Sequence, residues 1–148
     1  KTKKDVLLYM RFFCRKLVNN KITRDYEIDL ILRNDNQAHP VLGIFGRYIL
    51  VEAKNWKKKV GVEQVNHFLS KMKFHDCKCG ILISKNGSST SKKGIRYAHL
   101  TKLKEFHRYG QIMMELTLRD LEEISGGKNL LSILLERYED IRFDAFSK

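Results

Sequence analysis

Short apolar segments of strand length alternate with longer segments of helical spacing through most of the chain, and this order is the strongest constraint on the fold. Tyr48 to Lys54, Cys79 to Ser84 and Gln111 to Leu116 have the length and apolar content of buried strands. Gly61 to Phe74 and a basic segment from about Ser89 to Arg108 have helical spacing. Strands that alternate with helices form parallel pairs, because each helix returns the chain to the same end of the sheet.

The first part of the chain adds strands that follow one another directly. Asp5 to Val18 has apolar residues at intervals of three and four, which predicts a buried helix that ends at Asn19. Tyr26 to Leu32 alternates apolar and polar residues, which predicts a strand. We expect a turn at Arg33 to Asn36 and a further extended region at Val41 to Phe45.

Two short helices are predicted at the end of the chain. Thr117 and Asp120 form the pattern of a capping box, Gly126 ends the first helix, and the second runs from Asn129 to Glu139. Consecutive strands followed by strand–helix alternation predict an α/β fold, with a mixed central sheet flanked by helices on both faces. We expect residues 1–148 to form a single domain, excised from a larger protein because the chain does not begin with Met.

The net charge is the most unusual feature of the composition. The chain has 29 Lys and Arg against 17 Asp and Glu, which gives a formal net charge of +12. A surplus of this size attracts polyanions and raises their rate of encounter, and nucleic acid is the usual polyanion. The alternative is a solvated basic surface without a partner.

Cysteine content and hydropathy bear on the compartment. Three cysteines, an odd number, do not make a disulfide framework, so reduced thiols in a cytoplasmic protein are expected. No apolar run approaches the roughly 20 residues needed to cross a bilayer, and we expect no membrane partner.

Charged residues with the chemistry of a hydrolytic site lie on two of the predicted strands. Asp29 lies on the strand from Tyr26 to Leu32, and Glu52 and Lys54 lie on the strand from Tyr48 to Lys54. Because side chains two residues apart on a strand share a face, Glu52 and Lys54 are neighbours at roughly 6–7 Å along the strand. Burying such groups is costly unless they are paired or bound to a metal ion.

Phosphodiester hydrolysis explains this arrangement. Two carboxylates and a backbone carbonyl can bind a hard divalent cation, which activates water. An ammonium beside that water stabilises the charge that develops on phosphorus. The alternative is a surface salt bridge between Glu52 and Lys54, with Asp29 an incidental acid at a strand end.

These residues belong to an ordered set of short segments. The run Glu27-Ile28-Asp29-Leu30-Ile31 is followed by Val51-Glu52-Ala53-Lys54-Asn55, and Gln64 comes ten positions after Lys54. This order resembles the PD-(D/E)XK nuclease superfamily, and most closely its Mrr-like restriction endonuclease branch. The resemblance covers roughly Tyr26 to Ile124, although Asp29 is not preceded by Pro and the predicted first helix has Asp5 as its only acid.

The resemblance implies a fold of the restriction-endonuclease type and a metal-dependent endonuclease that hydrolyses phosphodiester bonds of DNA, in restriction or another defence role. Asp29 and Glu52 would be metal ligands, with the carbonyl of Ala53 as a third. Lys54 would hold or activate the water, and Gln64 would help to position the site. The expected cofactor is Mg²⁺, for which Mn²⁺ would substitute.

Two basic clusters are candidates for contacts with the DNA backbone. One directly follows the predicted site and the other begins the basic helix; they consist of Lys57, Lys58, Lys59, Lys92, Lys93 and Arg96. Such contacts position a duplex without reading its sequence. Because cutting both strands generally requires two sites, we expect a homodimer, and partner subunits or flanking domains stay open.

Other functions fit the same residues. A Holliday-junction or repair nuclease would use the same site, and a non-catalytic nucleic-acid-binding sensor would keep the fold without cleaving. An RNA nuclease would require the 2′-hydroxyl of its substrate. Mg²⁺-dependent cleavage separates a nuclease from the non-catalytic module, which would show none.

Overall fold

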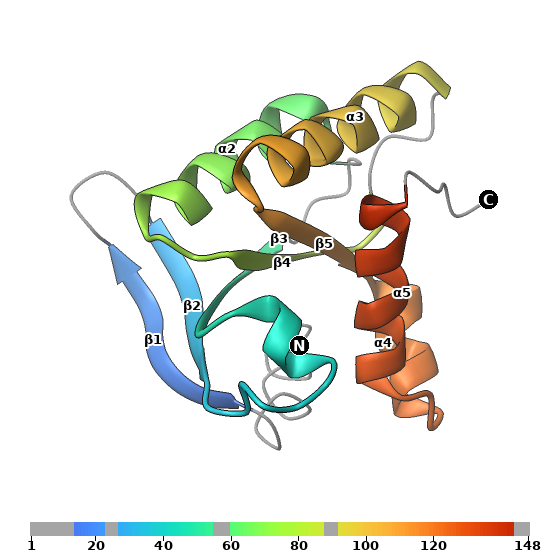
Figure 1. Cartoon of the computed structure of the whole chain (residues 1–148). Helices are drawn as coiled ribbons and strands as arrows, with labels where there is room; N and C mark the ends of the chain where they lie inside the picture. The colour runs from blue at the N-terminus through green and yellow to red at the C-terminus, as the bar shows by residue number, and fades with distance from the viewer. Residues whose placement is uncertain (1–13, 23–26, 55–59, 88–91, 144–148) are drawn as a thin grey trace.

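A five-stranded sheet forms the centre of the computed structural model, which describes residues 14–22, 27–54, 60–87 and 92–143 (Figure 1). Side chains are described in residues 30–54, 60–87 and 100–143. The elements in chain order are β1 (Cys14–Ile22), β2 (Glu27–Asn34), the 3-10 helix η1 (Leu42–Phe45), β3 (Tyr48–Lys54), α2 (Val62–Phe74), β4 (Cys79–Ser84), α3 (Lys92–Tyr109), β5 (Ile112–Thr117), α4 (Leu118–Ser125) and α5 (Leu130–Arg142).

Each strand of the sheet lies beside its neighbour in sequence, in the order β1-β2-β3-β4-β5. The pairs β1–β2 and β2–β3 are antiparallel, whereas β3–β4 and β4–β5 are parallel. The helices α2 and α3 connect the parallel strands and lie side by side over one face of the sheet (Figure 1). Residues of η1, α4 and α5 share a core with the other face. The predicted mixed sheet with helices on both faces is confirmed.

The two faces of the sheet belong to separate clusters of buried side chains. Val51 packs with η1, α4 and α5, whereas Leu50 packs with α2. The strand β4 is buried along its whole length, which explains its continuous apolar sequence. Gly80 allows α2 to approach β4 closely, since an added Cβ would lie 2.5 Å from Met72 Sδ and 2.6 Å from a ring carbon of Phe68.

The predicted N-terminal helix is wrong for the part that the structure describes. Cys14 to Val18 lies in β1, where Cys14 is opposite Asn34 of β2. The pairing register shifts between Lys16 and Val18. A β-bulge adds a residue to one strand and breaks the period of two, so the sequence pattern did not indicate a strand. Residues 5–13 of the predicted helix lie outside the described residues.

A buried asparagine stands where a turn was predicted, at Arg33 to Asn36. The strand β2 continues to Asn34, whose side-chain amide donates hydrogen bonds to the carbonyls of Leu42 at 2.7 Å and Gly46 at 3.0 Å. The region predicted as extended, Val41 to Phe45, contains η1 instead, with buried side chains at the first and last positions of that helix. Residues three apart share a face of a 3-10 helix, so a short apolar run fits either structure.

The other predicted elements are confirmed. The strands β3 and β4 have the predicted bounds, and β5 is shifted by one residue from its prediction. Thr117 caps α4 by accepting a hydrogen bond of 3.2 Å from the backbone of Asp120, and Asn129 caps α5. Within the described ranges, no helix has the length and hydropathy that a bilayer span requires.

Candidate active site

The end of β3 brings Glu52 and Lys54 to the middle of the sheet, on the face covered by α2. The strand pairs with β2 on one side and with β4 on the other. Glu52 is 3% exposed, and the side chain of Lys54 is 27% exposed. Both residues share a face with Leu50, because they occupy alternate positions of the strand. The burial of Glu52 does not fit the alternative of a surface salt bridge.

Asp29 lies in β2 near the end of that strand that adjoins Glu52. The antiparallel register pairs Ile31 with Leu50 and Leu30 with Val51. Asp29 directly precedes Leu30 and Glu52 directly follows Val51, so both acids are next to the same pair of this ladder. The side chain of Asp29 lies outside the described side chains. The two acids therefore lie at the same end of the β2–β3 ladder.

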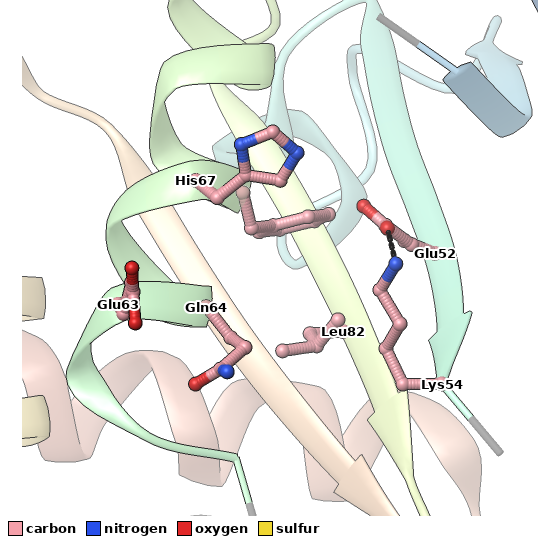
Figure 2. Close-up of a pocket in the computed structure, with 7 residues that line it drawn as sticks. Glu52, Lys54, Glu63, Gln64, His67 and Leu82 are labelled. Atoms are coloured by element: carbon pink, nitrogen blue, oxygen red, sulfur yellow. Dashed lines mark ion pairs between the residues drawn. The ribbon is translucent and has the colours of Figure 1, made fainter. Parts of the chain in front are cut away.

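Two ammonium groups contact the carboxylate of Glu52. Lys54 Nζ lies 2.5 Å from Glu52 Oε1 (Figure 2). Lys71 Nζ donates hydrogen bonds to both oxygens of Glu52, at 3.0 Å to Oε1 and 3.1 Å to Oε2. The side chain of Lys71 comes from α2 and is 5% exposed. Among the described side chains, the cluster therefore combines one negative and two positive charges in a largely buried place, where charges interact more strongly than in water.

Lys71 is a residue of the candidate site that the sequence pattern did not reveal. The spacing of apolar residues from Gly61 to Phe74 places Lys71 on the polar side of the helix, together with Gln64 and His67. In the structure the side chain of Lys71 turns inward to Glu52. The sequence contains one indication that Lys71 could lie near the site. Lys71 follows Gln64 by seven residues, or two helical turns, so the two residues lie on the same side of α2.

A pocket with a volume of about 250 Å³ opens beside this cluster (Figure 2). Side chains from β3, β4 and α2 form its walls: Glu52, Lys54, Glu63, Gln64, His67, Phe68 and Leu82. Gln64 has a second contact, since its side-chain oxygen accepts a hydrogen bond of 2.9 Å from the backbone N–H of Gly61. This bond satisfies a free N–H at the start of α2 and links the pocket wall to the loop after β3.

The Lys71 ammonium also affects the pKa of His75, at the end of α2. Burial lowers the pKa of His75, and the nearby Lys71 ammonium lowers that pKa further. Burial, together with the Asp76 carboxylate, raises the pKa of the Cys77 thiol to about 11. Both effects favour neutral side chains, and neither residue lines the pocket.

The structure describes the other predicted site residues only in part. Ala53 lies between Glu52 and Lys54 on β3 and is paired with Ile83 of β4. Its side chain packs against the core on the other face of the sheet, the one shared with η1, α4 and α5. Lys57 to Lys59 lie outside the described residues. Three further predicted contacts, Lys92, Lys93 and Arg96, lie in the first turns of α3, outside the described side chains.

Three helices begin at the edge of the sheet where Lys54 lies. The helices α2, α3 and α4 follow the ends of β3, β4 and β5, which are parallel, so the N-termini of these helices share that edge. Two of the connections also touch, because the N–H of Val60 donates to the carbonyl of Gly87 at 2.9 Å. Helix N-termini carry partial positive charge, which favours phosphate groups at this edge.

The mixed sheet, its flanking helices and the position of Glu52 and Lys54 define a restriction-endonuclease-like fold. A family model described as a restriction endonuclease, the Mrr catalytic domain, matches residues 7–105. The match spans more than half of the 148 residues, and the chain therefore belongs to this restriction endonuclease family. Family membership makes the chain a nuclease of the endonuclease type, and nucleases of this family act on DNA. No similar protein was found among the curated proteins, and none among the solved structures.

Proposed function

We propose that the chain is a Mg²⁺-dependent endodeoxyribonuclease that hydrolyses DNA phosphodiester bonds in restriction or another defence role. The observation that carries this proposal is the carboxylate of Glu52, which is buried at a pocket wall beside the Lys54 ammonium and next to the strand position of Asp29. Enzymes of restriction-endonuclease type generally use a divalent metal ion, and Mn²⁺ would substitute for Mg²⁺ here.

The donor atoms at this place suit a hard divalent cation. Asp29, Glu52 and the carbonyl of Ala53 supply oxygen ligands from two adjacent strands, and Mg²⁺ prefers oxygen. Within the described residues, no three His, Cys, Asp or Glu side chains form a group of metal ligands. Two carboxylates with a backbone carbonyl, water and substrate phosphate are a sufficient set for Mg²⁺. When bound, the ion neutralises the phosphate and lowers the pKa of a coordinated water.

The side chains of the chain supply the other parts of the reaction. Lys54, at the pocket wall, orients the attacking water and stabilises the negative charge that develops on the phosphoryl oxygens. Gln64 faces the same pocket and positions the groups around it. The burial of Glu52 strengthens these electrostatic interactions, because the surroundings have a lower effective dielectric constant than water.

The DNA contacts follow from the shared edge of the sheet. Lys57 to Lys59 come between β3 and α2 in the sequence, and Lys92, Lys93 and Arg96 belong to the start of α3, the helix that follows β4. Both clusters would bind backbone phosphates, which position the duplex without reading its sequence. We further propose that residues 1–148 form a single domain that acts as a homodimer when both DNA strands are cut.

The test is incubation of supercoiled plasmid with the full chain and Mg²⁺ or Mn²⁺, together with calorimetric titration of the same ions. We expect nicked or linear plasmid with the wild-type chain. Asp29→Asn and Glu52→Gln should each abolish both cleavage and binding of the ion at a shared site. A matched control is Glu115→Gln, because Glu115 is also a largely buried strand carboxylate that pairs with a helix lysine, at 2.9 Å from Lys102.

Two results would contradict the proposal. Unchanged binding of the ion in Asp29→Asn and Glu52→Gln would place the metal ion elsewhere. Plasmid binding without cleavage under either ion would instead indicate a non-catalytic sensor. Cleavage of a four-way junction in preference to a linear duplex would favour the junction nuclease over a restriction enzyme.

A further inference from the structure

Two ammonium groups, those of Lys54 and Lys71, contact the carboxylate of Glu52. Lys71 adds a second ammonium that donates to both oxygens and is itself 5% exposed. A buried ammonium is unfavourable unless it is paired, so Lys71 depends on Glu52 as its partner.

Lys102 is another helix lysine that pairs with a carboxylate on a strand. Lys102 of α3 donates to Glu115 Oε2 of β5 at 2.9 Å, and the two side chains are 14% and 12% exposed. This pair also joins a helix to a strand, yet neither residue lines the pocket beside Glu52. At Glu52, Lys71 donates to both oxygens of a carboxylate that Lys54 also contacts.

A divalent cation held by Glu52 must use the same oxygen lone pairs. It would also bring two positive charges close to two ammonium groups, and this repulsion is larger in the interior than in water. Lys71 therefore opposes the cation both by occupying the carboxylate and by its charge. Lys54 differs in its exposure, since its side chain can turn towards the pocket while Lys71 is enclosed between α2 and the sheet.

We propose that Lys71 is a positioning residue that competes with the metal ion for the carboxylate of Glu52, so that the site takes up a divalent cation mainly when DNA phosphate is present. The inference rests on the proposed metal site at Asp29 and Glu52. A backbone phosphate at the pocket adds negative charge beside the cation and the two lysines, and it thereby lowers the free energy of the state that holds all three. Metal uptake is thereby coupled to substrate binding.

The first measurement is cation affinity without DNA, by calorimetric titration of Mn²⁺ and of Ca²⁺ into the full chain. Lys71→Met keeps the length and burial of the side chain and removes the charge, and Lys71→Gln keeps a hydrogen-bond donor. We expect both variants to bind the cation at least about tenfold more tightly than wild type, which is the scale of removing one nearby charge. Lys102→Met, the matched control, should bind the cation as wild type does.

The second measurement is the coupling between cation and DNA. The factor by which a cation raises DNA affinity equals the factor by which DNA raises cation affinity. We expect Ca²⁺ to strengthen binding of a duplex to the wild-type chain markedly. The same factor should be at least about tenfold smaller in Lys71→Met, because its site already accepts the cation without phosphate.

The outcomes separate this inference from the proposed function. Unchanged or weaker cation binding in both folded Lys71 variants would overturn the competition and leave Lys71 a structural support of Glu52. Circular dichroism measures whether the variants fold. Loss of folding in both Lys71 variants would also count against the proposed competition, because a residue that only competes with the cation is not needed for folding. Cation binding that survives in Glu52→Gln would instead refute the metal site itself.

Discussion

The side-chain oxygen of Gln64 accepts a hydrogen bond of 2.9 Å from the backbone N–H of Gly61, at the start of α2. Gln64 also lines the pocket beside Glu52. Replacing Gln64 with Ala removes a helix cap and a pocket side chain together. We expect Gln64→Ala to lower the free energy of unfolding by about 1 kcal/mol, as for the loss of a helix cap, and also to slow cleavage. Urea denaturation and plasmid cleavage measure the two effects.

A second substitution separates the two roles of Gln64. Glu is the other residue that forms this type of cap, so Gln64→Glu keeps an oxygen for the N–H of Gly61 and removes the amide group from the pocket. We expect stability within about 0.5 kcal/mol of wild type and slow cleavage. Wild-type cleavage by Gln64→Glu would show that Gln64 is a helix cap and nothing more.

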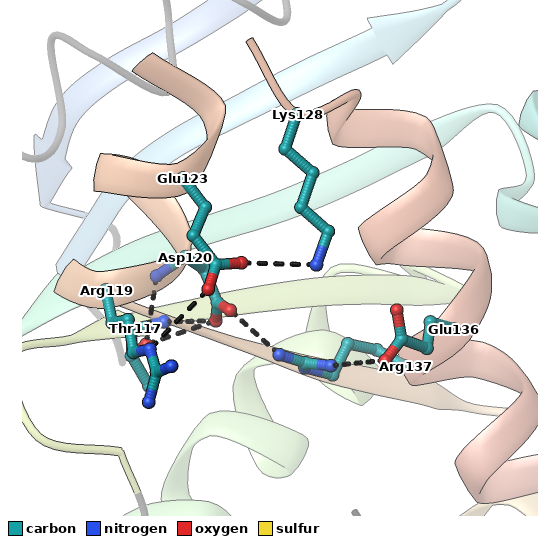
Figure 3. A network of polar contacts seen from close by, with 7 residues as sticks. All are labelled: Thr117, Arg119, Asp120, Glu123, Lys128, Glu136 and Arg137. Atoms are coloured by element: carbon teal, nitrogen blue, oxygen red, sulfur yellow. Dashed lines mark hydrogen bonds and ion pairs between the residues drawn. The ribbon is translucent and has the colours of Figure 1, made fainter. Parts of the chain in front are cut away.

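Asp120 joins α4 to α5 away from the pocket (Figure 3). Its carboxylate accepts hydrogen bonds from the backbone N–H of Thr117 at 2.8 Å and from Arg137 Nη2 at 2.9 Å, and it is buried. Arg137→Met leaves one oxygen of Asp120 without this donor. We expect a loss of about 1–3 kcal/mol in the free energy of unfolding, with cleavage retained.

A more exposed ion pair, also drawn in Figure 3, provides the control for that prediction. Lys128 contacts Glu123 at 3.1 Å, with side chains 47% and 37% exposed. Pairs of this kind contribute at most about 1 kcal/mol, because water screens them and side-chain entropy is lost. Lys128→Met should therefore be less destabilising than Arg137→Met. Equal unfolding free energies for the two variants would mean that the buried Arg137–Asp120 contact contributes no more to stability than the exposed pair does.

The central strands and the helix ends could be predicted because local signals define them. β3 and β4 are apolar runs bounded by polar turns, and their bounds agree with the prediction. Thr117 and Asn129 cap helices by contacts with residues close in sequence. The alternation along β3 also predicted that Glu52 and Lys54 share a face, and the structure shows them in contact.

The remaining features depend on contacts between segments far apart in sequence. The bulge in β1 follows from its pairing with β2, and the sequence of β1 alone looked helical. Asn is typical of turns, and the sequence therefore predicted a turn at Asn34. In the structure Asn34 is buried, because the carbonyls of Leu42 and Gly46 accept its hydrogen bonds. Lys71 is buried because Glu52, 19 positions earlier, meets it. A lysine on a helix predicts exposure unless the partner is known.

The basic segment after β3 leads to a prediction about salt. Replacing Lys57, Lys58 and Lys59 together with Ala should weaken DNA binding irrespective of sequence. The slope of log K against log salt should shrink by roughly 0.9 for each phosphate of duplex DNA that the variant no longer neutralises. Fluorescence anisotropy at several salt concentrations measures the slope, and Lys128→Ala, at a distant pair with Glu123, is the control. An unchanged slope in the triple variant would direct attention to Lys92, Lys93 and Arg96.

Replacement of Lys54 tests its role in cleavage separately from its role in DNA binding. Lys71 still pairs with Glu52 when Lys54 is changed, so Lys54→Met should fold with Glu52 compensated. If the ammonium of Lys54 acts on the charge that develops in the transition state, the cleavage rate should fall by about 10²- to 10³-fold, the scale expected for removal of one electrostatic stabiliser. Single-turnover cleavage of a defined duplex measures this rate without a contribution from product release.

Binding should respond differently from cleavage in the same variant. DNA affinity measured with Ca²⁺ should change little, because one phosphate contact among many is a small share of the total. Lys102→Met removes a comparable helix–strand ion pair outside the pocket and should cut DNA at the wild-type rate. A Lys54→Met protein that binds and cuts DNA as wild type does would exclude Lys54 from the chemistry. A slow protein with normal affinity would place the ammonium at the reacting phosphate, since only an interaction that forms in the transition state changes rate without changing affinity.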